Sequence, residues 1–260
     1  MQPTGKHREI LRCPNCGERV TAGEHALACT NCPETIPLVD GIPYYPVDQT
    51  DTTFPTLFDV ISPIYETQLW FPTVYRVIGG PFAPEDDRDW LAAALDADDD
   101  LVLDVACGTG RFSRYVAPDA EDVWGIDVAE RMLQLGRRYL ARDDIDNVQF
   151  VRMGVENLSF DTRTFDSVCC GWAIHLFPDR KRSFEEMSRV LRPGGTFVGT
   201  TILDAPMGAV PGLGQWAKKT TGLKPFTRPE LRSMLIEAGF EAPRIERSGL
   251  ALFFETTATE

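Results

Sequence analysis

Short apolar runs alternate with amphipathic stretches from residue 90 to the end of the chain. The apolar runs predict strands at 101–105, 123–127, 148–153, 167–171 and 196–201. Between them, apolar residues at helical spacing predict helices at 111–117, 129–141 and 182–191. This alternation predicts an α/β fold, with a parallel sheet and right-handed crossover connections.

The end of the chain departs from this alternation. A helix is predicted over 228–238, ended by Gly239, and two strands follow at 244–248 and 250–256 with only Gly249 between them. A parallel return needs a crossover of roughly a dozen residues. The two strands are therefore expected to form an antiparallel hairpin at the edge of the sheet.

The segment that precedes this domain, residues 54–82, is rich in aromatic residues. Its apolar residues recur at helical spacing and predict one or two helices, through Leu57, Phe58, Ile61, Ile64, Tyr65 and Leu69. Two interpretations stay open. The helices pack against the domain, or they form a lid that carries Tyr65, Trp70 and Tyr75 over a pocket.

Four cysteines near the start stand as two C-x2-C pairs, Cys13 with Cys16 and Cys29 with Cys32, twelve residues apart. Each pair makes a tight turn that directs two thiolates at one point, and two such turns complete a tetrahedral zinc site. Four thiolates leave no open position, so the metal would fold a segment too small to bury its own core. Two disulfides are the alternative, and they need an oxidising compartment that nothing in the sequence indicates.

A region rich in Pro, Gly and polar residues follows the second pair, over 34–55. It predicts a closing hairpin of the zinc ribbon and then a linker, with a boundary near Asp51. We therefore expect three parts, which are a zinc ribbon with its linker at 1–50, the aromatic segment at 51–89 and the α/β domain at 90–260.

A length of 260 residues corresponds to about 1.7 typical domains, which fits one full domain and a small appendage. The hydrophobic fraction of 43% is enough for a conventional core. No window approaches 18 consecutive apolar residues, and the first residues lack the apolar stretch of a signal peptide. We expect no membrane span and a cytoplasmic protein.

The charge balance is unusual, because 21 Arg and 5 Lys face 22 Asp and 17 Glu, for a net charge of −13. An acidic, Lys-poor composition is typical of proteins in a salt-filled, halophilic cytoplasm. At molar salt the Debye length falls to about 3 Å, and phosphate attraction loses most of its counterion-release drive. Acidity alone therefore does not exclude an RNA partner.

Parallel sheets bind ligands beyond the carboxyl ends of their strands. The first strand runs into Asp104 and the small residues Ala106, Cys107, Gly108, Thr109 and Gly110, which let the backbone pass close to a ligand. The next strand ends in Asp127, whose carboxylate can accept both hydroxyls of a ribose. A nucleoside cofactor is therefore expected.

Two residues discriminate among nucleoside cofactors. The dinucleotide fingerprint needs Gly or Ala at position 113, where this chain has Ser113. Asp104 would repel a pyrophosphate and attract an ammonium or sulfonium group. A nicotinamide oxidoreductase is disfavoured for these reasons.

At this point the chain resembles the class I S-adenosylmethionine (SAM) dependent methyltransferases, over roughly 90–260. The matching segments are VLDVACGTG (102–110), GIDVAERML (125–133), FDSVCCGWAIHLFPD (165–179) and RVLRPGGTFV (189–198). The resemblance implies a Rossmann-like, seven-stranded, mostly parallel sheet that ends in a reversed hairpin. It also implies an enzyme that uses SAM.

The resemblance also implies positions for the cofactor. Residues 106–110 would wrap its methionine part, with Asp104 near the amino group. Asp127 would hold the ribose hydroxyls, and Val128 and Met132 would flank the adenine. Further contacts are expected from Val155, Glu156, Gly171 and Trp172.

Two positions depart from the family pattern. Gly154 stands where many members carry an Asp that bonds the adenine amino group, so weaker or rearranged cofactor binding is expected, with the Val155 N–H and Glu156 as substitutes. Loss of one charge-assisted hydrogen bond costs about 1.5–3 kcal/mol. Ala106 replaces the first glycine of the usual loop, which is a small change.

SAM carries a good leaving group, so catalysis mainly requires an acceptor held in line in a dry site. Where a base is needed, the candidate is His175, although a His at this position can also simply bond a loop backbone. Trp172 packs either on the cofactor or at the sheet edge. Cys107, Cys169 and Cys170 are expected to be small buried hydrophobes.

Two groups of methyltransferases combine a thiolate ribbon with this domain. One methylates guanine in ribosomal RNA, and the other contains plastid and bacterial proteins similar to quinone-pathway C-methyltransferases. FVGTTIL (197–203) and the aromatic segment resemble the second group, and the ribbon carries net −2 with no basic stripe. We expect a small, partly apolar, quinone- or lipid-like acceptor. An rRNA or tRNA base and a non-catalytic SAM-binding scaffold are the alternatives.

Overall fold

The computed structural model describes residues 10–47, 84–204 and 223–260. The candidate lid residues Tyr65, Trp70 and Tyr75 and the boundary near Asp51 lie outside the described residues.

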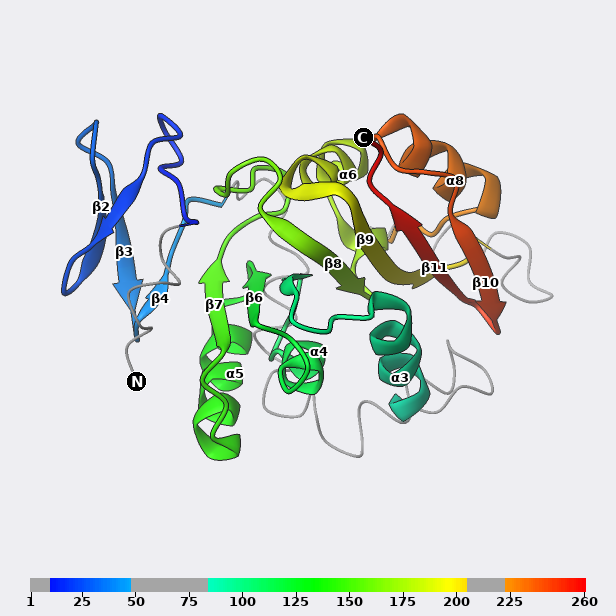
Figure 1. Cartoon of the computed structure of the whole chain (residues 1–260), viewed down its shortest axis with the longest axis horizontal. Coiled ribbons are helices and arrows are strands. Elements are labelled where there is room, and N and C mark those ends of the chain that lie inside the picture. Colours follow the sequence, from blue (N-terminus) through cyan, green and yellow to red (C-terminus); the bar gives the residue numbers. More distant parts are fainter. Residues whose placement is uncertain (1–9, 48–83, 205–222) are drawn as a thin grey trace.

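A seven-stranded sheet with the order β10-β11-β9-β8-β5-β6-β7 forms the centre of the molecule (Figure 1). Its strands β5 to β9 are mutually parallel, and β11 pairs antiparallel with both β9 and β10. The Rossmann-like fold and its terminal hairpin are thus confirmed. The bounds are β5 Leu101–Val105, β6 Asp122–Asp127, β7 Val148–Arg152, β8 Phe165–Gly171, β9 Leu191–Ile202, β10 Arg244–Ser248 and β11 Ala251–Thr257.

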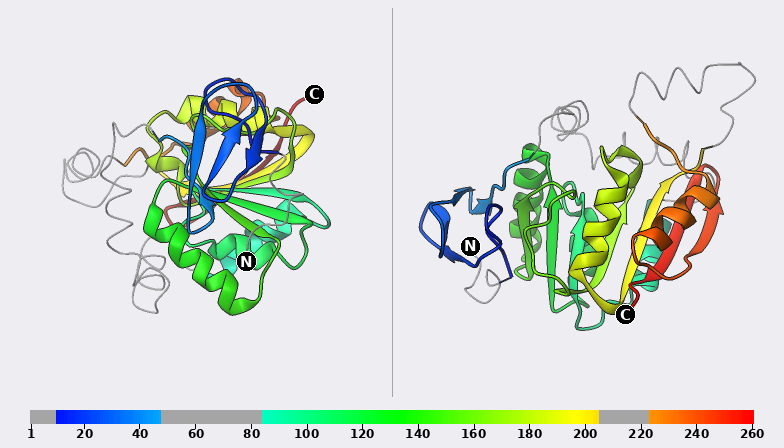
Figure 2. Two further views of the ribbon diagram at one scale, coloured as in Figure 1. Left: turned by 90° about the vertical axis from the view of Figure 1, so that its left-hand side faces the viewer. Right: turned by 90° about the horizontal axis from the view of Figure 1, so that it is seen from above.

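Helices cover both faces of this sheet (Figures 1 and 2). One face carries α3 (Pro84–Leu95), α4 (Arg111–Val116) and α5 (Glu130–Asp143), and the other carries α6 (Arg180–Val190) and α8 (Arg228–Glu237). Helix α5 shows why these segments fold as they do, because its buried residues recur on one side, at Met132, Leu133, Gly136 and Leu140. Helix α8 begins with a capping box formed by Thr227 and Glu230.

Several observed boundaries differ from the sequence prediction, and three of these differences change the description of the fold. Helix α3 begins at Pro84 and straddles the expected boundary at 89/90. Strand β9 begins at Leu191 instead of Thr196, with a register shift opposite Phe165 and Ser167. The terminal hairpin pairs Ser248 with Ala251, so its turn contains Leu250 as well as Gly249.

The four-cysteine module, which we define as residues 10–47, contains a small antiparallel sheet. Its strands are β1 Val20–Ala22, β2 Ala26–Cys29, β3 Thr35–Val39 and β4 Ile42–Pro43. The pairing of Leu38 with Pro43 confirms the expected closing hairpin. The module lies beside β7, the edge strand of the large sheet (Figure 1), and Tyr44 bridges to Arg152 at the end of that strand.

The module shares its core with the α/β domain. Leu11, Leu27 and Ile36 are buried in the same apolar cluster as residues of β5, β6 and α6. Ile42 belongs to the cluster on the opposite face of the sheet. The module therefore covers the β7 edge and is packed on the domain rather than tethered to it.

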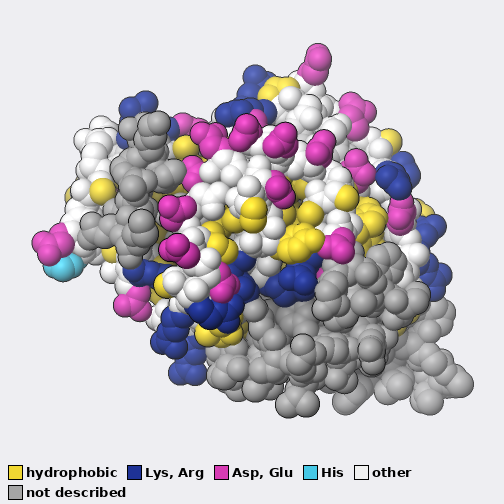
Figure 3. Space-filling view, turned by 60° about the horizontal axis from the view of Figure 1, so that its bottom comes forward, with side chains coloured by type: hydrophobic (Ala, Val, Ile, Leu, Met, Phe, Trp, Pro, Cys, Tyr) yellow, Lys and Arg dark blue, Asp and Glu magenta, His cyan; other side chains and the backbone are white. Residues whose placement is uncertain are grey.

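Acidic side chains are spread over the face shown in Figure 3 and lie among Lys and Arg side chains. This distribution fits a solvated acidic surface. Within the described ranges, no helix is long and apolar enough to cross a membrane.

Candidate functional site

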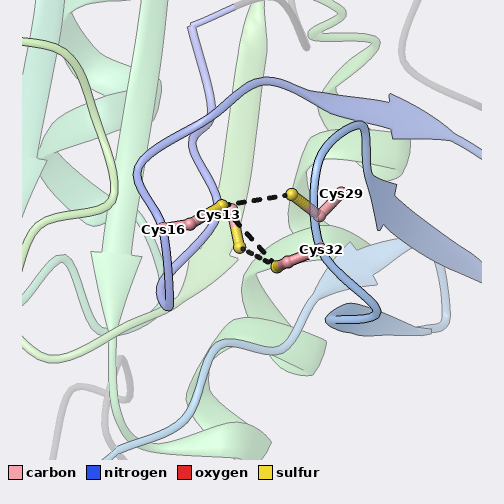
Figure 4. A group of neighbouring side chains, drawn as sticks. All are labelled: Cys13, Cys16, Cys29 and Cys32. Carbon is pink, nitrogen blue, oxygen red and sulfur yellow. Dashed lines mark hydrogen bonds between the residues drawn. The ribbon is translucent and has the colours of Figure 1, made fainter.

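The four cysteine thiols of the module converge on one point (Figure 4). All four sulfur atoms lie within 4.8 Å of one another, and three of the separations are 3.6 Å (Cys13–Cys32), 3.4 Å (Cys16–Cys29) and 3.6 Å (Cys16–Cys32). Zinc–sulfur bonds of about 2.3 Å in a tetrahedron place the sulfurs about 3.8 Å apart. The cluster therefore fits a tetrahedral thiolate-bound metal ion.

Backbone geometry also favours thiolates at this cluster. The Asn31 N–H donates to Cys29 Sγ at 3.4 Å, and backbone hydrogen bonding of this kind lowers the pKa of Cys29 to about 6. Backbone hydrogen bonds act in the same direction on Cys16 and Cys32, but burial and the neighbouring thiols raise the pKa of both. Since four thiolates fill a tetrahedral sphere, a metal held here has no position for a substrate or water. The arrangement suits a structural ion.

At the carboxyl edge of the large sheet, residues 106–110 form a loop between β5 and α4, the glycine loop. Its backbone alternates through left-handed conformations, with φ of 55° at Ala106, 58° at Gly108 and 69° at Gly110. Glycine adopts this region freely, whereas alanine there is strained by roughly 1–2 kcal/mol. Alanine in place of glycine at position 106 therefore costs conformational free energy, whereas only a small change was expected from the sequence.

Asp127, at the end of β6, holds the glycine loop in place. Its carboxylate accepts from the Gly108 N–H and from the Ala129 N–H, each at 2.8 Å. The side chain is half-buried. Asp127 thus connects the loop after β5 with the start of α5. The family resemblance predicts that the ribose hydroxyls bind to this residue.

Asp104 is only 2% exposed and is bonded within the protein. It accepts from the Ser113 hydroxyl at 2.6 Å, the Ser113 N–H at 3.1 Å and the Cys169 thiol at 3.3 Å. Burial raises its pKa to about 6, against the opposing effect of these hydrogen bonds. Ser113, which excluded the dinucleotide fingerprint, thus fixes Asp104 and the first turn of α4.

Three glycines pack around the ring of Phe150, and sequence reasoning missed two of them. A Cβ on Gly110 would collide with this ring, and a Cβ on Gly125 would lie 2.8 Å from both the ring and Cys107 Sγ. A Cβ on Gly136 would lie 2.6 Å from the Thr109 carbonyl oxygen. Because Gly125 on β6 and Gly136 on α5 have no side chains, the glycine loop can pack closely against Phe150. The need for glycine at these two positions is visible only in the three-dimensional contacts.

The residues expected on the adenine side lie on the loop after β6, on α5 and after β7. Met132 and Val155 are buried, whereas Val128 and Glu156 are half-buried. A Cβ on Gly154 would lie 3.4 Å from Glu156 Oε2. The Glu156 carboxylate therefore lies close to the point where the Asp side chain of the family would begin. This proximity is consistent with the prediction that Glu156 replaces that Asp.

Trp172 adopts a left-handed φ of 61° directly after Gly171 at the end of β8. Its indole N–H donates to Asp87 at 2.8 Å, and its ring packs edge-on against Phe253. Asp87 is buried on α3 and is paired with Arg111 at 2.9 Å. This network joins α3, the start of α4 and the end of β8. Sequence patterns did not single out Asp87, which lies in the segment assigned to the lid, or Arg111, which lies at the start of a predicted helix.

His175 is 5% exposed, in a short 3-10 helix at Ile174–Leu176. Its Nδ1 lies 3.4 Å from Thr201 Oγ1, and burial lowers its pKa to about 3. A base with so low a pKa is poorly matched to proton removal near neutral pH. The surroundings of His175 favour its packing role.

The remaining three cysteines lie beside Asp104. Cys169 and Cys170 are fully buried and Cys107 is half-buried, and burial raises the pKa of each thiol. They are therefore neutral and unreactive, as small buried hydrophobes are.

Part of the α/β domain is similar to known proteins. Residues 102–195 match the methyltransferase domain family. The match confirms the motif resemblance to class I SAM-dependent methyltransferases over these residues, which are about a third of the chain.

Curated relatives match half of the chain or less. One is a demethylmenaquinone methyltransferase of Symbiobacterium thermophilum, 38% identical over 116 residues, which are 43% of this chain and 46% of that protein. Another is an uncharacterized chloroplastic methyltransferase of Arabidopsis thaliana, 37% identical over 135 residues, which are 50% of this chain and 38% of that protein. The chain thus spans less than half the length of these relatives.

Among solved structures, the [4+2]-cyclase SpnF matches with a TM-score of 0.68 and 17% identity, covering 84% of this chain and 98% of that chain. This likeness supports the fold. It also shows that a protein named for cyclisation shares it, so the fold alone does not determine the reaction.

Proposed function

We propose that this chain transfers a methyl group from SAM to a small, partly apolar acceptor of the quinone or lipid type. The observation that carries the proposal is the pairing of two carboxylates, Asp104 and Asp127, with the glycine loop at the ends of adjacent parallel strands. When bound, SAM supplies a methyl group on a positively charged sulfur. The protein must hold the acceptor in line with this methyl group and exclude water.

The two carboxylates do different work. Asp104 provides a negative charge beneath the glycine loop, where the low dielectric strengthens its attraction for a cation. Asp127 accepts from two backbone amides and keeps lone pairs for hydroxyl groups. Together they favour a cationic nucleoside over a diphosphate.

The four-cysteine cluster is proposed to hold Zn²⁺, because its sulfur separations match a tetrahedral thiolate site. Its function is structural. Ion release is expected on denaturation or on treatment with a strong chelator.

The acceptor assignment rests on the named relatives and on the aromatic residues at 54–82. Demethylmenaquinone methyltransferases act, by their name, on a quinone precursor. An RNA base is the alternative acceptor, with the module as the RNA-holding part. No observation in the described residues favours it.

The test is incubation of the purified protein with methyl-labelled SAM and either a demethylated quinone extract or total RNA. We expect label in the apolar extract. Label in RNA alone would overturn the acceptor assignment, and binding of NAD instead of SAM would overturn the cofactor assignment.

A second candidate is a SAM-binding protein that transfers no methyl group. It is favoured by the burial of His175, the base candidate named from sequence, and by the shared fold with a cyclase. Any turnover of labelled SAM into a methylated product would eliminate it.

A further inference from the structure

The loop at residues 153–159 follows β7 and carries Val155 and Glu156, the expected adenine contacts. The four-cysteine module holds this loop at both ends. Before the loop, the Tyr45 N–H donates to the Arg152 carbonyl at 2.9 Å. At its end, the Arg12 N–H donates to the Ser159 carbonyl at 2.8 Å, and Leu11 bridges to Phe160.

The Arg12 connection starts beside the cysteine cluster, and the Tyr45 connection is joined to it through Arg12. Arg12 directly precedes Cys13, whereas Tyr45 follows the β3–β4 hairpin that begins just after Cys32. The two segments are also joined to each other, because the Tyr45 hydroxyl donates to the Arg12 carbonyl at 3.0 Å. Arg12 adds an ion pair to Asp161, beyond the loop.

The module also approaches the loop from outside. A Cβ on Gly154 would lie 3.9 Å from Val47 Cγ1, so Val47 lies beside the position where the family carries its adenine-binding Asp. On the inner side, the Met153 N–H donates to the Asp127 carbonyl at 3.1 Å and the Leu158 N–H to Glu186 at 2.8 Å. The loop therefore lies between β6 and α6 on one side and the module on the other.

We propose that the four-cysteine module is a clamp on the adenine side of the cofactor pocket, so that metal bound at the cysteines raises the affinity for SAM through the 153–159 loop. Tyr45 and Arg12 are positioning residues, which act through the loop backbone. A metal at Cys13 would fix the adjoining Arg12 segment, to which the Tyr45 hydroxyl is bonded, so that the loop is ordered before the cofactor arrives. This inference rests on the proposed cofactor.

The test compares metal-loaded and chelator-treated full-length protein in calorimetry with S-adenosylhomocysteine and in hydrogen exchange. Removal of the metal is expected to weaken binding tenfold or more. Exchange protection is expected to fall in 153–159 as well as in 10–47, while β5, β8 and β9 keep theirs. Equal affinity with and without metal, while 10–47 loses protection, would overturn the inference.

Variants separate the clamp from simple unfolding. Tyr45→Phe keeps the ring and the metal site but removes the bond between the two segments, and we expect about threefold weaker binding, since one hydrogen bond contributes about 0.5–1.5 kcal/mol. Tyr139→Phe on α5 is the matched control and is expected to change nothing. Unchanged binding in Tyr45→Phe with normal exchange in 153–159 would also contradict the clamp.

Failure of the proposed function gives a different result from failure of the clamp. If metal-loaded protein binds neither S-adenosylhomocysteine nor SAM, the cofactor assignment fails and the clamp falls with it. If it binds both regardless of metal, the cofactor assignment stands and only the clamp is wrong.

Discussion

The four-cysteine module and the glycine-loop pocket are both suited to hold a positive charge, but they are built from different parts. In the module, four side chains at fixed sequence spacing converge, and the backbone only orients them. At the glycine loop, the backbone of residues 106–110 is held by Asp127, and both Asp127 and Asp104 accept from backbone N–H groups of the loop and its neighbours. We therefore expect the metal site to fail when any one cysteine is replaced. The conformation of the glycine loop should instead depend on the residues packed beneath it, such as Gly136.

The largest expected effect in this comparison is on the metal ligands. Cys16→Ala removes one of four thiolates, and we expect the module to lose its metal and its exchange protection over 10–47, because the metal supplies much of the module's folding free energy. The matched control is Cys170→Ala, which removes a buried non-ligand thiol and is expected to cost about 1 kcal/mol while keeping the metal. Similar metal content in both variants would contradict the assignment.

A smaller effect is expected beneath the glycine loop. Gly136→Ala places a methyl group 2.6 Å from the Thr109 carbonyl oxygen, and overpacking of this kind costs about 1–3 kcal/mol. Alanine stabilises the helix by about 1 kcal/mol, so we expect a net loss of about 0–2 kcal/mol in the free energy of unfolding, together with weaker SAM binding. Arg138→Ala on the exposed side of α5 is the control, and denaturant unfolding with calorimetry is the measurement. A stabilised Gly136→Ala with normal SAM affinity would show that the loop tolerates displacement.

The third prediction concerns pH. Because the pKa of Asp104 is about 6, its charge is lost as the pH falls through that value, and a cationic ligand then loses attraction. We expect SAM affinity to drop about tenfold between pH 7.5 and pH 5, and Asp104→Asn to bind weakly with little pH dependence. The neighbouring thiols of Cys107 and Cys169 stay neutral in this range.

The raised pKa of Asp104 also makes the free energy of unfolding depend on pH. A carboxyl with a raised folded-state pKa stabilises the fold most when protonated, below its unfolded pKa near 4, and that contribution is lost as pH rises through about 6. Asp104→Asn is therefore expected to fold at least as well as wild type at pH 7.5. A strongly destabilised variant at that pH would mean that the carboxylate is needed for the fold.

The smallest effect is expected at the strained alanine. Ala106→Gly relieves a left-handed φ of 55° and is expected to raise the free energy of unfolding by about 0.5–1 kcal/mol, after the entropy of the added glycine is counted. Ala141→Gly in α5 is the opposite control and is expected to lower it by about 1 kcal/mol. Thermal and denaturant unfolding of both variants settle the sign.

Local patterns predicted much of the fold and part of the site. The strands, the terminal hairpin and the cysteine cluster follow from periodicity, turn chemistry and spacing, which neighbouring residues determine. Contacts between distant segments were not predictable, such as Gly136 beneath Thr109, Asp87 with Trp172, and Arg12 with Ser159. The identities of the SAM-contacting residues stay predictions.

Two expectations were sharpened by burial. The family resemblance predicts Asp104 near the ligand, and the structure adds that its oxygens accept from Ser113 and Cys169. The sequence also offers His175 as a base, and its burial with a pKa near 3 shows why residue type alone is a poor guide to proton transfer.

The central claim is that the pocket at the ends of β5 and β6 binds SAM, and the most direct measurement is the SAM dissociation constant of wild type and Asp127→Asn at pH 7.5. Asparagine keeps one acceptor oxygen for the glycine loop but loses the charge and the second acceptor. We predict that wild type binds and that the variant binds about ten- to a hundredfold more weakly, since a charge-assisted hydrogen bond contributes about 1.5–3 kcal/mol. Equal affinity in the two proteins would contradict the claim.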